Sequence, residues 1–260
     1  MDLGLKDKRA LVCGSSQGIG KATAMALAAE GVRVTLLARN ESSLKSVIEE
    51  LPNSSRHNYL IADFSNPEEV SHIVRQYIAA QGGFHILVNN TGGPKSGALA
   101  DAESKELEIA FKMHVICNQI LVQALLPFMK EACFGRIINI ISTSVKEPIE
   151  GLGVSNTIRN AVANWSKSLA TELAVFGVTV NNVLPGFTET KRLDSIITVK
   201  AKKAQVTEAE MAQIMRHYVP AKRFGRAEEV ASAIAFLSSE SAAYITGINL
   251  PVDGGRTKSL

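Results

Sequence analysis

The sequence predicts an α/β fold in which one doubly wound parallel sheet carries helices on both of its faces. Short runs rich in leucine, isoleucine and valine are apolar almost throughout, as strands must be when a parallel sheet is buried on both faces. Longer segments between these runs place apolar residues at three- and four-residue spacings, which is typical of amphipathic helices. Regular alternation of the two patterns favours βαβ units, whose strands lie parallel in one sheet.

The predicted elements follow one another without an internal repeat, a low-complexity tract or a Pro/Gly/Ser-rich linker. We therefore expect a single domain over residues 1–260, a length within the range of one α/β domain. The predicted strands are residues 9–13, 33–38, 57–62, 85–90, 136–141, 178–184 and 248–252. The helical pattern occupies residues 21–30, 67–80, 104–131 and 156–176.

Residues 187–226 break this alternation, because about forty residues separate the sixth strand from the next apolar helix. A long excursion after the carboxyl end of a strand is where α/β folds commonly build a substrate lid. The segment is rich in lysine and arginine, which suits an acidic substrate such as a phosphopantetheine carrier. Solvated helix faces are the simpler explanation of the same charges. His217 and Tyr218 lie in this lid and are candidates for the pocket beneath it.

Composition and charge restrict the class of protein further. Hydrophobic residues make up 46% of the chain and charged residues 20%, a balance typical of a soluble globular protein with a sizeable core. The net charge of +3 gives no reason to expect a nucleic-acid partner. No run approaches the roughly 18 apolar residues of a membrane span, and the N-terminus lacks a secretion-signal pattern. We therefore expect a cytoplasmic protein without membrane attachment.

The three cysteines, Cys13, Cys117 and Cys133, lie far apart and form no Cys-x-x-Cys pair. We expect neither a metal site nor a disulfide framework from this pattern. All three are interpreted as buried, reduced thiols, which fits a cytoplasmic protein.

A glycine-rich turn joins the first predicted strand to the first predicted helix in the stretch "LVCGSSQGIGKATA". Glycines let the chain turn tightly and let its backbone approach a pyrophosphate, where side chains would be in the way. The following helix directs free N–H groups and the positive end of its dipole at the same phosphate. Glycines also make plain turns, but the strand–turn–helix context favours a dinucleotide. The predicted phosphate site comprises Gly14, Ser15, Ser16, Gln17, Gly18, Ile19 and Gly20.

The end of the second predicted strand favours NADP(H) over NAD(H). Enzymes that use NAD commonly place an acid here to accept hydrogen bonds from the ribose 2′-hydroxyl. This chain instead reads Ala38, Arg39 and Asn40, with no acid before Glu41. A guanidinium grips a 2′-phosphate through two hydrogen bonds, whereas a carboxylate would repel it. We expect Arg39 and Asn40 to contact the cofactor; a solvated residue at a helix start is the alternative for Arg39.

These motifs resemble the short-chain dehydrogenase/reductase family, over nearly the whole chain. "CGSSQGIG" is similar to T-G-x-x-x-G-I-G with Cys13 in the threonine place, and "VNNTGG" is similar to N-N-A-G with Thr91 replacing alanine. "VTVNNVLPGFTET" and the C-terminal third also match the family pattern, nearest its 3-oxoacyl-carrier-protein reductase branch. The resemblance implies a Rossmann-type domain with further cofactor contacts from Asp63, Phe64, Asn90, Gly92, Pro185, Gly186 and Thr188.

The resemblance also places four residues at the family's catalytic positions, of which three are substituted. Where the family carries Asn, Ser, Tyr and Lys, this chain has His114, Ser142, Ser155 and Arg159. A serine hydroxyl is a far weaker acid than a tyrosine beside a lysine, and an arginine stays protonated at ordinary pH. Both serines can still polarise a carbonyl, and Arg159 can hold the nicotinamide half of the cofactor. We hypothesise that His114 supplies the missing proton; a structural histidine in a buried helix is the alternative.

Three functions are compatible with these residues. The first is an oxidoreductase acting on a carbonyl or alcohol, or on an acyl thioester, and the intact cofactor segments and lid favour it. The second is an inactive NADP(H)-binding sensor, which the substituted tyrosine and lysine places favour. A structural partner with an empty pocket is less favoured, and acyl hydrolysis lacks the G-x-S-x-G pattern around either serine. The resemblance further implies a homo-oligomer, a tetramer or dimer, formed through the helices at 104–131 and 156–176.

Overall fold

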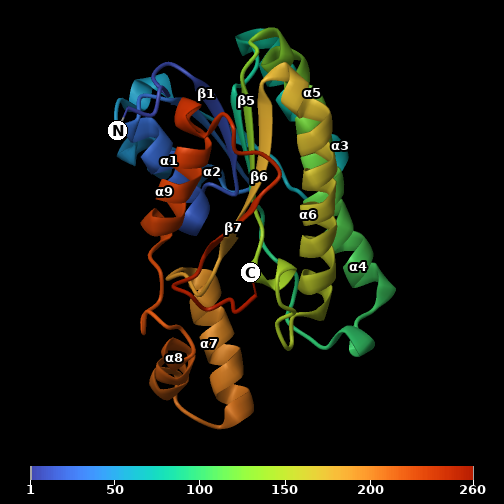
Figure 1. Cartoon of the computed structure of the whole chain (residues 1–260), viewed down its shortest axis with the longest axis vertical. Helices are drawn as coiled ribbons and strands as arrows, with labels where there is room; N and C mark the ends of the chain where they lie inside the picture. The colour runs from blue at the N-terminus through green and yellow to red at the C-terminus, as the bar shows by residue number, and fades with distance from the viewer. Residues whose placement is uncertain (1, 260) are drawn as a thin grey trace.

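Seven parallel strands form one sheet in the computed structural model, and the structure describes residues 2–259 (Figure 1). Their order is β3-β2-β1-β4-β5-β6-β7, so the chain winds outward from β1 to one edge and from β4 to the other. The predicted doubly wound α/β fold is therefore confirmed. In such sheets ligands bind outside the carboxyl ends of the strands, where the winding reverses between β1 and β4. The strands are β1 (Arg9–Cys13), β2 (Arg33–Ala38), β3 (Asn58–Ile61), β4 (Ile86–Asn89), β5 (Gly135–Ile140), β6 (Val178–Pro185) and β7 (Asn249–Val252).

Helices cover both faces of this sheet, as Figure 1 shows. One face is covered by α1, α2 and α9, and the other by α3, α5 and α6. Crossover helices of this kind are what joins parallel strands. The helices predicted at 21–30, 67–80 and 156–176 are found with small shifts at their ends. The bounds are α1 (Gly18–Ala29), α2 (Glu41–Glu50), α3 (Pro67–Gln81), α5 (Cys117–Glu131), α6 (Gly153–Leu173) and α9 (Ala227–Leu237).

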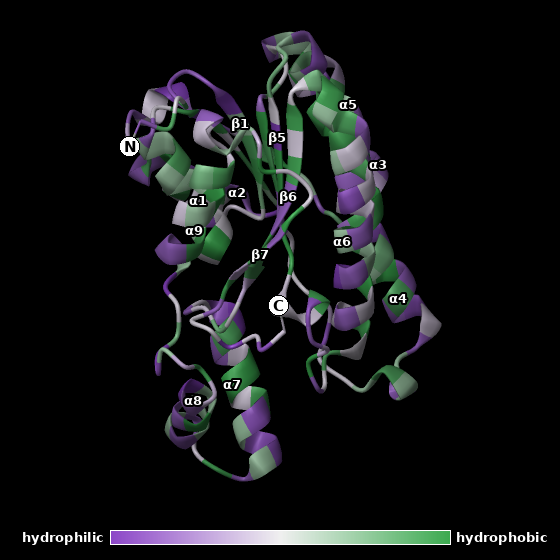
Figure 2. Cartoon of the chain, in the orientation of Figure 1, coloured by the Kyte–Doolittle hydropathy of each residue, from purple (hydrophilic) through white to green (hydrophobic). Residues whose placement is uncertain are grey.

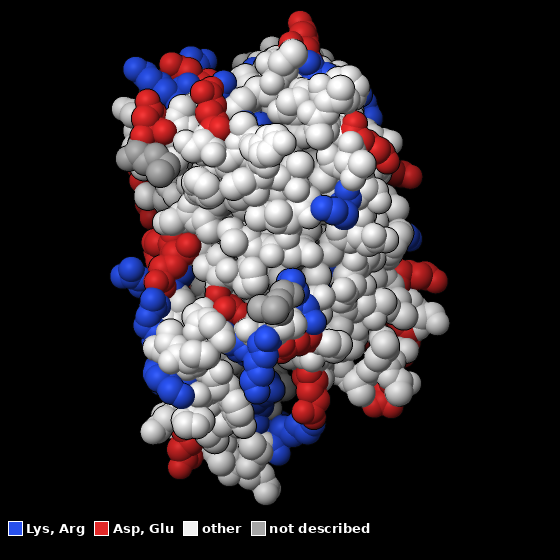
Figure 3. Space-filling view, in the orientation of Figure 1, with Lys and Arg blue, Asp and Glu red and all other residues white. Residues whose placement is uncertain are grey.

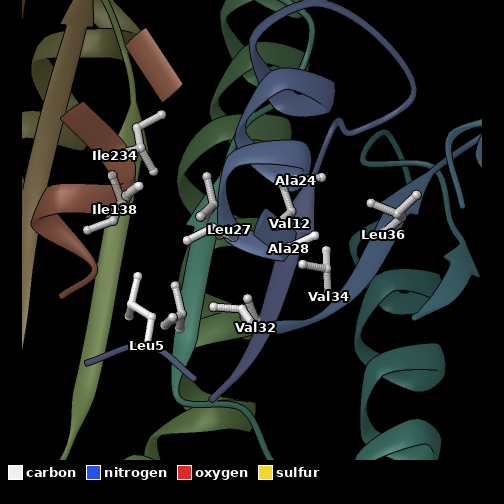
Figure 4. Packing of buried hydrophobic residues seen from close by; sticks show 14 of the residues in the cluster. Leu5, Val12, Ala24, Leu27, Ala28, Val32, Val34, Leu36, Ile138 and Ile234 are labelled. Atoms are coloured by element: carbon white, nitrogen blue, oxygen red, sulfur yellow. The ribbon is translucent and has the colours of Figure 1, made fainter. Parts of the chain in front are cut away.

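The strands bury apolar side chains on both faces, because successive residues point to opposite sides. In β1, Val12 packs into the cluster on the α1 side, whereas Leu11 packs into the cluster on the α3 and α5 side. Figure 4 shows Val12 among side chains of α1, including Ala24 and Leu27. The strands at the centre of Figure 2 show green interrupted by purple and white segments, while the surrounding helices carry both colours.

A ladder of asparagine side chains crosses four strands of this otherwise apolar sheet. The Asn89 amide donates to Asn139 Oδ1 at 2.8 Å, the Asn139 amide to Asn182 Oδ1 at 2.9 Å, and the Asn182 amide to Asn249 Oδ1 at 2.8 Å. These residues are direct partners in the register of β4, β5, β6 and β7. Because a buried amide is costly unless it is hydrogen-bonded, any shift in register would be penalised.

The helix predicted at 104–131 is not a single regular helix. It consists of α4 (Ser104–Phe111), a π-helical turn over Lys112–Ile116, and α5. A π-helical turn accommodates one extra residue and is frequent at functional sites. By length and composition alone, this continuous stretch is the one described segment that could cross a membrane. In the fold, its α5 half packs Leu121, Leu125 and Met129 into the core on the α3 side of the sheet.

Within the segment predicted as a lid, two helices lie beyond the carboxyl ends of the strands (Figure 1). They are α7 (Lys191–Ala204) and α8 (Glu208–His217), and they bury a small core of their own that includes Leu193 and Met215. Basic and acidic side chains are mixed around these helices and the C-terminal tail (Figure 3).

One expectation about the cysteines is wrong. Cys13 and Cys117 are buried, but Cys133 is exposed. Cys133 lies in the tight turn between α5 and β5 and has a positive φ of 48°, so the chain turns at the surface there instead of entering the core.

Candidate functional site

The turn between β1 and α1 depends on its glycines. Gly14 and Gly18 have φ values of 59° and 56°, a conformation that other residues disfavour. A Cβ atom on Gly20 would lie 2.2 Å from the Gly14 carbonyl oxygen, far inside van der Waals contact. The turn is therefore compact and has an accessible backbone, as close approach to a pyrophosphate requires.

The N-terminus of α1 has no side-chain cap within the described residues. The Gln17 side chain makes no capping hydrogen bond, and the first turn of α1 contains no acidic residue. The helices α2, α3, α7 and α8 each begin with a side-chain cap, whereas α4 and α6 also lack one but do not follow a glycine turn of this kind. Because uncapped N–H groups at a helix start bind anions, the residues present fit the pyrophosphate of a dinucleotide.

Two of the predicted cofactor contacts, Ser15 and Asn90, hold the turn in place. Ser15 is fully buried, and its Oγ accepts a hydrogen bond from the Leu37 backbone N–H at 3.1 Å. The Asn90 amide donates to the carbonyl oxygens of Cys13 and Gly14 at 3.3 and 3.2 Å. The Ser15 side chain thus faces β2 and leaves only its backbone for a ligand. Ser16 and Ile19 remain partly exposed and Gln17 exposed.

Arg39 follows β2 and is available to a ligand. Its side chain is 74% exposed and lies 3.6 Å from the Asp63 carboxylate, a surface ion pair of the kind that contributes little stability. Asn40 is the cap of α2, because its Oδ1 accepts hydrogen bonds from the Ser43 N–H and the Ser42 hydroxyl, both at 2.8 Å. The Asn40 side chain is therefore already engaged in the helix cap, whereas the exposed Arg39 guanidinium has only the surface ion pair with Asp63.

Asp63 and Phe64 follow β3, next to the end of β2. Partial burial raises the pKa of Asp63, but hydrogen bonds from Ser65 and the charge of Arg39 outweigh it and hold that pKa below its ordinary value. The carboxylate is therefore ionised near neutral pH. The Phe64 carbonyl oxygen accepts a hydrogen bond from Cys117 Sγ at 3.3 Å, which fixes the backbone that was expected to meet the adenine.

The ends of β4 and β6 complete the predicted cofactor set. A Cβ atom on Gly92 would meet no atom within 4 Å, so a ligand can approach its backbone freely. After Pro185, a Cβ atom on Gly186 would lie 2.7 Å from the Asp253 Cα atom, which keeps this turn against the C-terminal segment. Thr188 is buried, and its hydroxyl donates to the Gly186 carbonyl oxygen at 3.2 Å.

Three of the four predicted catalytic residues lie at the end of β5 and on the part of α6 that reaches it. Ser142 follows β5, and its Oγ accepts a hydrogen bond from the Ser144 N–H at 3.1 Å. Ser155 and Arg159 lie four residues apart on the buried face of α6. Arg159 reaches back to β5, because its Nη1 donates to the Ile140 carbonyl oxygen at 3.0 Å. Within residues 2–259 the Ser155 hydroxyl forms no hydrogen bond, so it is available to a ligand.

The fourth residue, His114, enters the same region from the π-helical turn, which packs against α6. His114 is 3% exposed, and its Nε2 has no hydrogen-bond partner among the described residues. Burial lowers the pKa of His114 well below its usual range, and the charge of Arg159 lowers it further, while a hydrogen bond to the Gly92 backbone opposes this. The imidazole is therefore neutral at neutral pH when no ligand is bound.

A second guanidinium, which sequence analysis did not single out, comes to this region from the lid. Arg192 lies in the first turn of α7, and its Nη2 donates to the Pro94 carbonyl oxygen at 3.0 Å. Thr190, which caps α7, lies over the glycine turn, since a Cβ on Gly18 would be 3.2 Å from its methyl carbon. The general basicity of the lid was the only sequence signal for Arg192.

A cavity of about 190 Å³ lies between the β5–α6 loop and the C-terminal tail. Arg256 Nη1 donates to Thr143 Oγ1 at 3.3 Å, and its guanidinium lies 4.3 Å from the centre of the Phe187 ring. Of the two lid candidates, Tyr218 lines this cavity, whereas His217 does not. No sequence motif indicated that the C-terminal tail, residues 256–258, would line a cavity. The lining residues are Thr143, Glu147, Pro148, Ile149, Tyr218, Arg256, Thr257 and Lys258.

A doubly wound sheet with a glycine turn and an uncapped helix at its switch point defines the class of dinucleotide-binding α/β proteins. A family model described as Enoyl-(Acyl carrier protein) reductase matches residues 14–257. The NADPH-dependent reductase BacG of Bacillus subtilis is 31% identical over 260 residues, covering 98% of this chain and 100% of that protein. The chain belongs to the short-chain dehydrogenase/reductase family of oxidoreductases, which confirms the resemblance seen in the sequence.

Other relatives agree with this assignment. The 3-oxoacyl-[acyl-carrier-protein] reductase FabG of Vibrio cholerae is 36% identical over 255 residues, covering 97% of this chain and 98% of that protein. The structure of L-sorbose reductase from Gluconobacter frateurii, complexed with NADPH and L-sorbose, superimposes with a TM-score of 0.94 at 31% identity and covers both chains fully. The structure of YwfH, an NADPH-dependent reductase involved in bacilysin biosynthesis, has a TM-score of 0.92 at 31% identity and covers 98% of this chain and 100% of its own.

Proposed function

We propose that this protein is an NADP(H)-dependent oxidoreductase that interconverts a carbonyl group and an alcohol through a modified catalytic site. The main support is the glycine turn that leads into the uncapped N-terminus of α1, beside the exposed guanidinium of Arg39. A relative that is an NADPH-dependent reductase supports the same cofactor. A relative that is a 3-oxoacyl reductase supports a carbonyl substrate. An inactive NADP(H)-binding sensor is the alternative, because Ser155 and Arg159 occupy the tyrosine and lysine places.

The chain's own residues fit the following roles. When bound, the nicotinamide would supply or accept the hydride. The hydroxyls of Ser142 and Ser155 donate hydrogen bonds to the substrate oxygen, where negative charge develops during reduction. Arg159 contributes a fixed positive charge beside that oxygen. The protonated imidazole of His114 donates the proton during reduction, and its neutral form accepts it in the reverse direction.

The cofactor preference is tested by measuring NADPH and NADH binding to the wild type and to Arg39→Ser. A hydrogen-bonded charge pair contributes about 1.5–3 kcal/mol, so we expect Arg39→Ser to weaken NADPH binding by about 10- to 100-fold and to leave NADH binding nearly unchanged. Arg33→Ser is the matched control, because Arg33 is also paired with an aspartate but lies at the opposite end of β2. Equal loss of both dinucleotides in Arg39→Ser would contradict the preference, and no binding of either to the wild type would overturn the proposed function.

Turnover is measured separately from binding. NADPH consumption is followed with acetoacetyl thioesters and small ketones as substrates. Consumption with any of them supports the enzyme, whereas tight NADPH binding without consumption across the panel supports the sensor.

The role of His114 gives a pH-dependent prediction. Because burial and Arg159 lower its pKa, the protonated imidazole is populated only at acid pH. We expect the rate of carbonyl reduction to rise as pH falls toward that low pKa, and to fall as pH increases. His114→Asn, which restores the residue expected from the family pattern, should flatten this limb of the pH–rate profile. An unchanged profile shape in His114→Asn would exclude His114 as the proton donor.

A further inference from the structure

We propose that Arg159 and Arg192 form a subsite for a carboxylate group of the substrate, so that the molecule acted on is an oxo acid or hydroxy acid. The identity of the substrate rests on the function proposed above, whereas the subsite itself is defined by side chains of this protein.

Both guanidinium groups converge on one bare backbone position, Gly93. A Cβ atom on Gly93 would lie 3.7 Å from Arg192 Nη2 and 3.8 Å from Arg159 Nη2. The two nitrogen atoms are therefore separated by no more than the sum of these distances, although they come from α7 and α6. A small anion placed at Gly93 would contact both.

Arg159 has unused hydrogen-bond donors, as a comparison with Arg136, the second buried arginine, shows. Arg136 is 2% exposed, and its donors reach the carbonyl oxygens of Ser239, Gly135 and Gly177. Arg159 is 9% exposed, but the Ile140 carbonyl is its one hydrogen-bond partner among the described residues. A guanidinium carries five N–H donors, so Arg159 retains enough of them for the nicotinamide half of the cofactor and for a substrate anion.

The paired positive charges are not neutralised by the protein. None of the ion pairs within residues 2–259 includes Arg159 or Arg192. Burial lowers the pKa of Arg159 to about 10, and the charge of Arg192 adds to that effect with no acidic group opposing it. Arg159 is buried whereas Arg192 is exposed at the start of α7. A buried charge is costly unless it is paired, so an anion between the two guanidinium groups would pair the charge of Arg159 and offset its repulsion with Arg192.

The chemistry of the site favours a carboxylate. Planar guanidinium groups match the planar, two-oxygen geometry of a carboxylate and bind it through paired hydrogen bonds. Gly93 directly follows Gly92, whose backbone is close enough to His114 to raise the pKa of its imidazole, so an anion here would lie near the proposed proton donor. Arg192 also donates a hydrogen bond to the Pro94 carbonyl oxygen. This bond connects the start of the lid to the residue after Gly93.

Binding is tested first, with probes that cannot be reduced. The probes are phenylacetate, its neutral analogue phenylacetamide, and inorganic phosphate, each titrated in thermal-shift measurements with and without saturating NADPH. The proteins compared are the wild type, Arg192→Gln, Arg192→Lys and Arg75→Gln. Arg75 is exposed on α3 and supplies the matched loss of one charge. We expect phenylacetate to stabilise the wild type and Arg75→Gln, and phenylacetamide to have little effect. Arg192→Gln should bind phenylacetate about 10- to 100-fold more weakly, with NADPH affinity unchanged, and Arg192→Lys should retain part of the binding.

The same preference is then measured in turnover, with 2-oxo-4-phenylbutanoate and its neutral ethyl ester. We expect kcat/KM to favour the acid in the wild type, and we expect Arg192→Gln to lose that preference mainly through KM.

Three results would overturn the subsite. They are equal binding of phenylacetate and phenylacetamide to the wild type, equal binding of phenylacetate to the wild type and Arg192→Gln, and a matching loss of NADPH affinity in Arg192→Gln. Tighter binding of phosphate than of phenylacetate would overturn the carboxylate assignment. Phenylacetate binding that depends on Arg192, together with no turnover of any substrate, would uphold the subsite and reject the oxidoreductase.

Discussion

Gly20→Ala is expected to abolish measurable high-affinity NADPH binding, with a loss of at least about 100-fold, and to lower stability as well. The added methyl group would lie 2.2 Å from the Gly14 carbonyl oxygen and 2.9 Å from the Asn90 amide nitrogen. Overpacking of this kind costs about 1–3 kcal/mol. Since the Asn90 amide itself holds Cys13 and Gly14, the turn that faces the pyrophosphate would have to move.

Gly97→Ala is the control for this experiment. A Cβ atom there meets no atom within 4 Å, and Gly97 does not have a positive φ, so stability and NADPH affinity should both stay at the wild-type level. Thermal unfolding and NADPH fluorescence titration measure the two effects separately. A Gly20→Ala protein that binds NADPH as the wild type does would show that the glycine turn is not the phosphate site.

Asn139→Leu is expected to lower the free energy of unfolding by about 2–6 kcal/mol. Asn139 accepts from the Asn89 amide and donates to Asn182 Oδ1, and leucine, of similar size, can do neither. Each buried polar group left without a partner costs about 1–3 kcal/mol. The Asn89 amide and Asn182 Oδ1 account for the expected range, and the Ser166 hydroxyl also loses its longer 3.3 Å hydrogen bond. This is a large share of the roughly 5–15 kcal/mol by which a protein of this kind is stable.

Urea unfolding of three variants checks this result. Asn249→Leu removes the end of the ladder and strands one group, so it should cost about half as much as Asn139→Leu. Ser166→Ala removes only the 3.3 Å hydrogen bond from the Asn139 amide and should have a small effect. Equal unfolding free energies for the wild type and Asn139→Leu would mean that the ladder does not stabilise the sheet.

The sequence was sufficient to predict features that depend on neighbouring residues along the chain. The apolar runs at 9–13 and 33–38 coincide with β1 and β2, because burial on both faces leaves an unbroken apolar signal. The turn containing Gly14 and Gly18 was recognisable because its positive φ values restrict the residue type. Arg39 was predicted as a cofactor contact because it directly follows the second predicted strand, where no acidic residue is present.

Other features depend on contacts between residues far apart in sequence. The periodicity of 104–131 indicated one helix and gave no sign of the π-helical turn that brings His114 toward Arg159. The inward orientation of Ser15 depends on the Leu37 N–H of the neighbouring strand. The exposure of Cys133 likewise depends on where the chain turns after α5.

By itself, the sequence determined the fold class, the glycine turn and the substitutions at the catalytic places, since each is encoded in short stretches whose residue types have few alternatives. Only the tertiary structure decided how the site is charged. Arg159, Arg192 and Gly93 lie in three separate segments, and neither composition nor spacing states that two guanidinium groups meet at one glycine. Side-chain electrostatics act over a few ångströms of space, and folding alone sets which charges come that close.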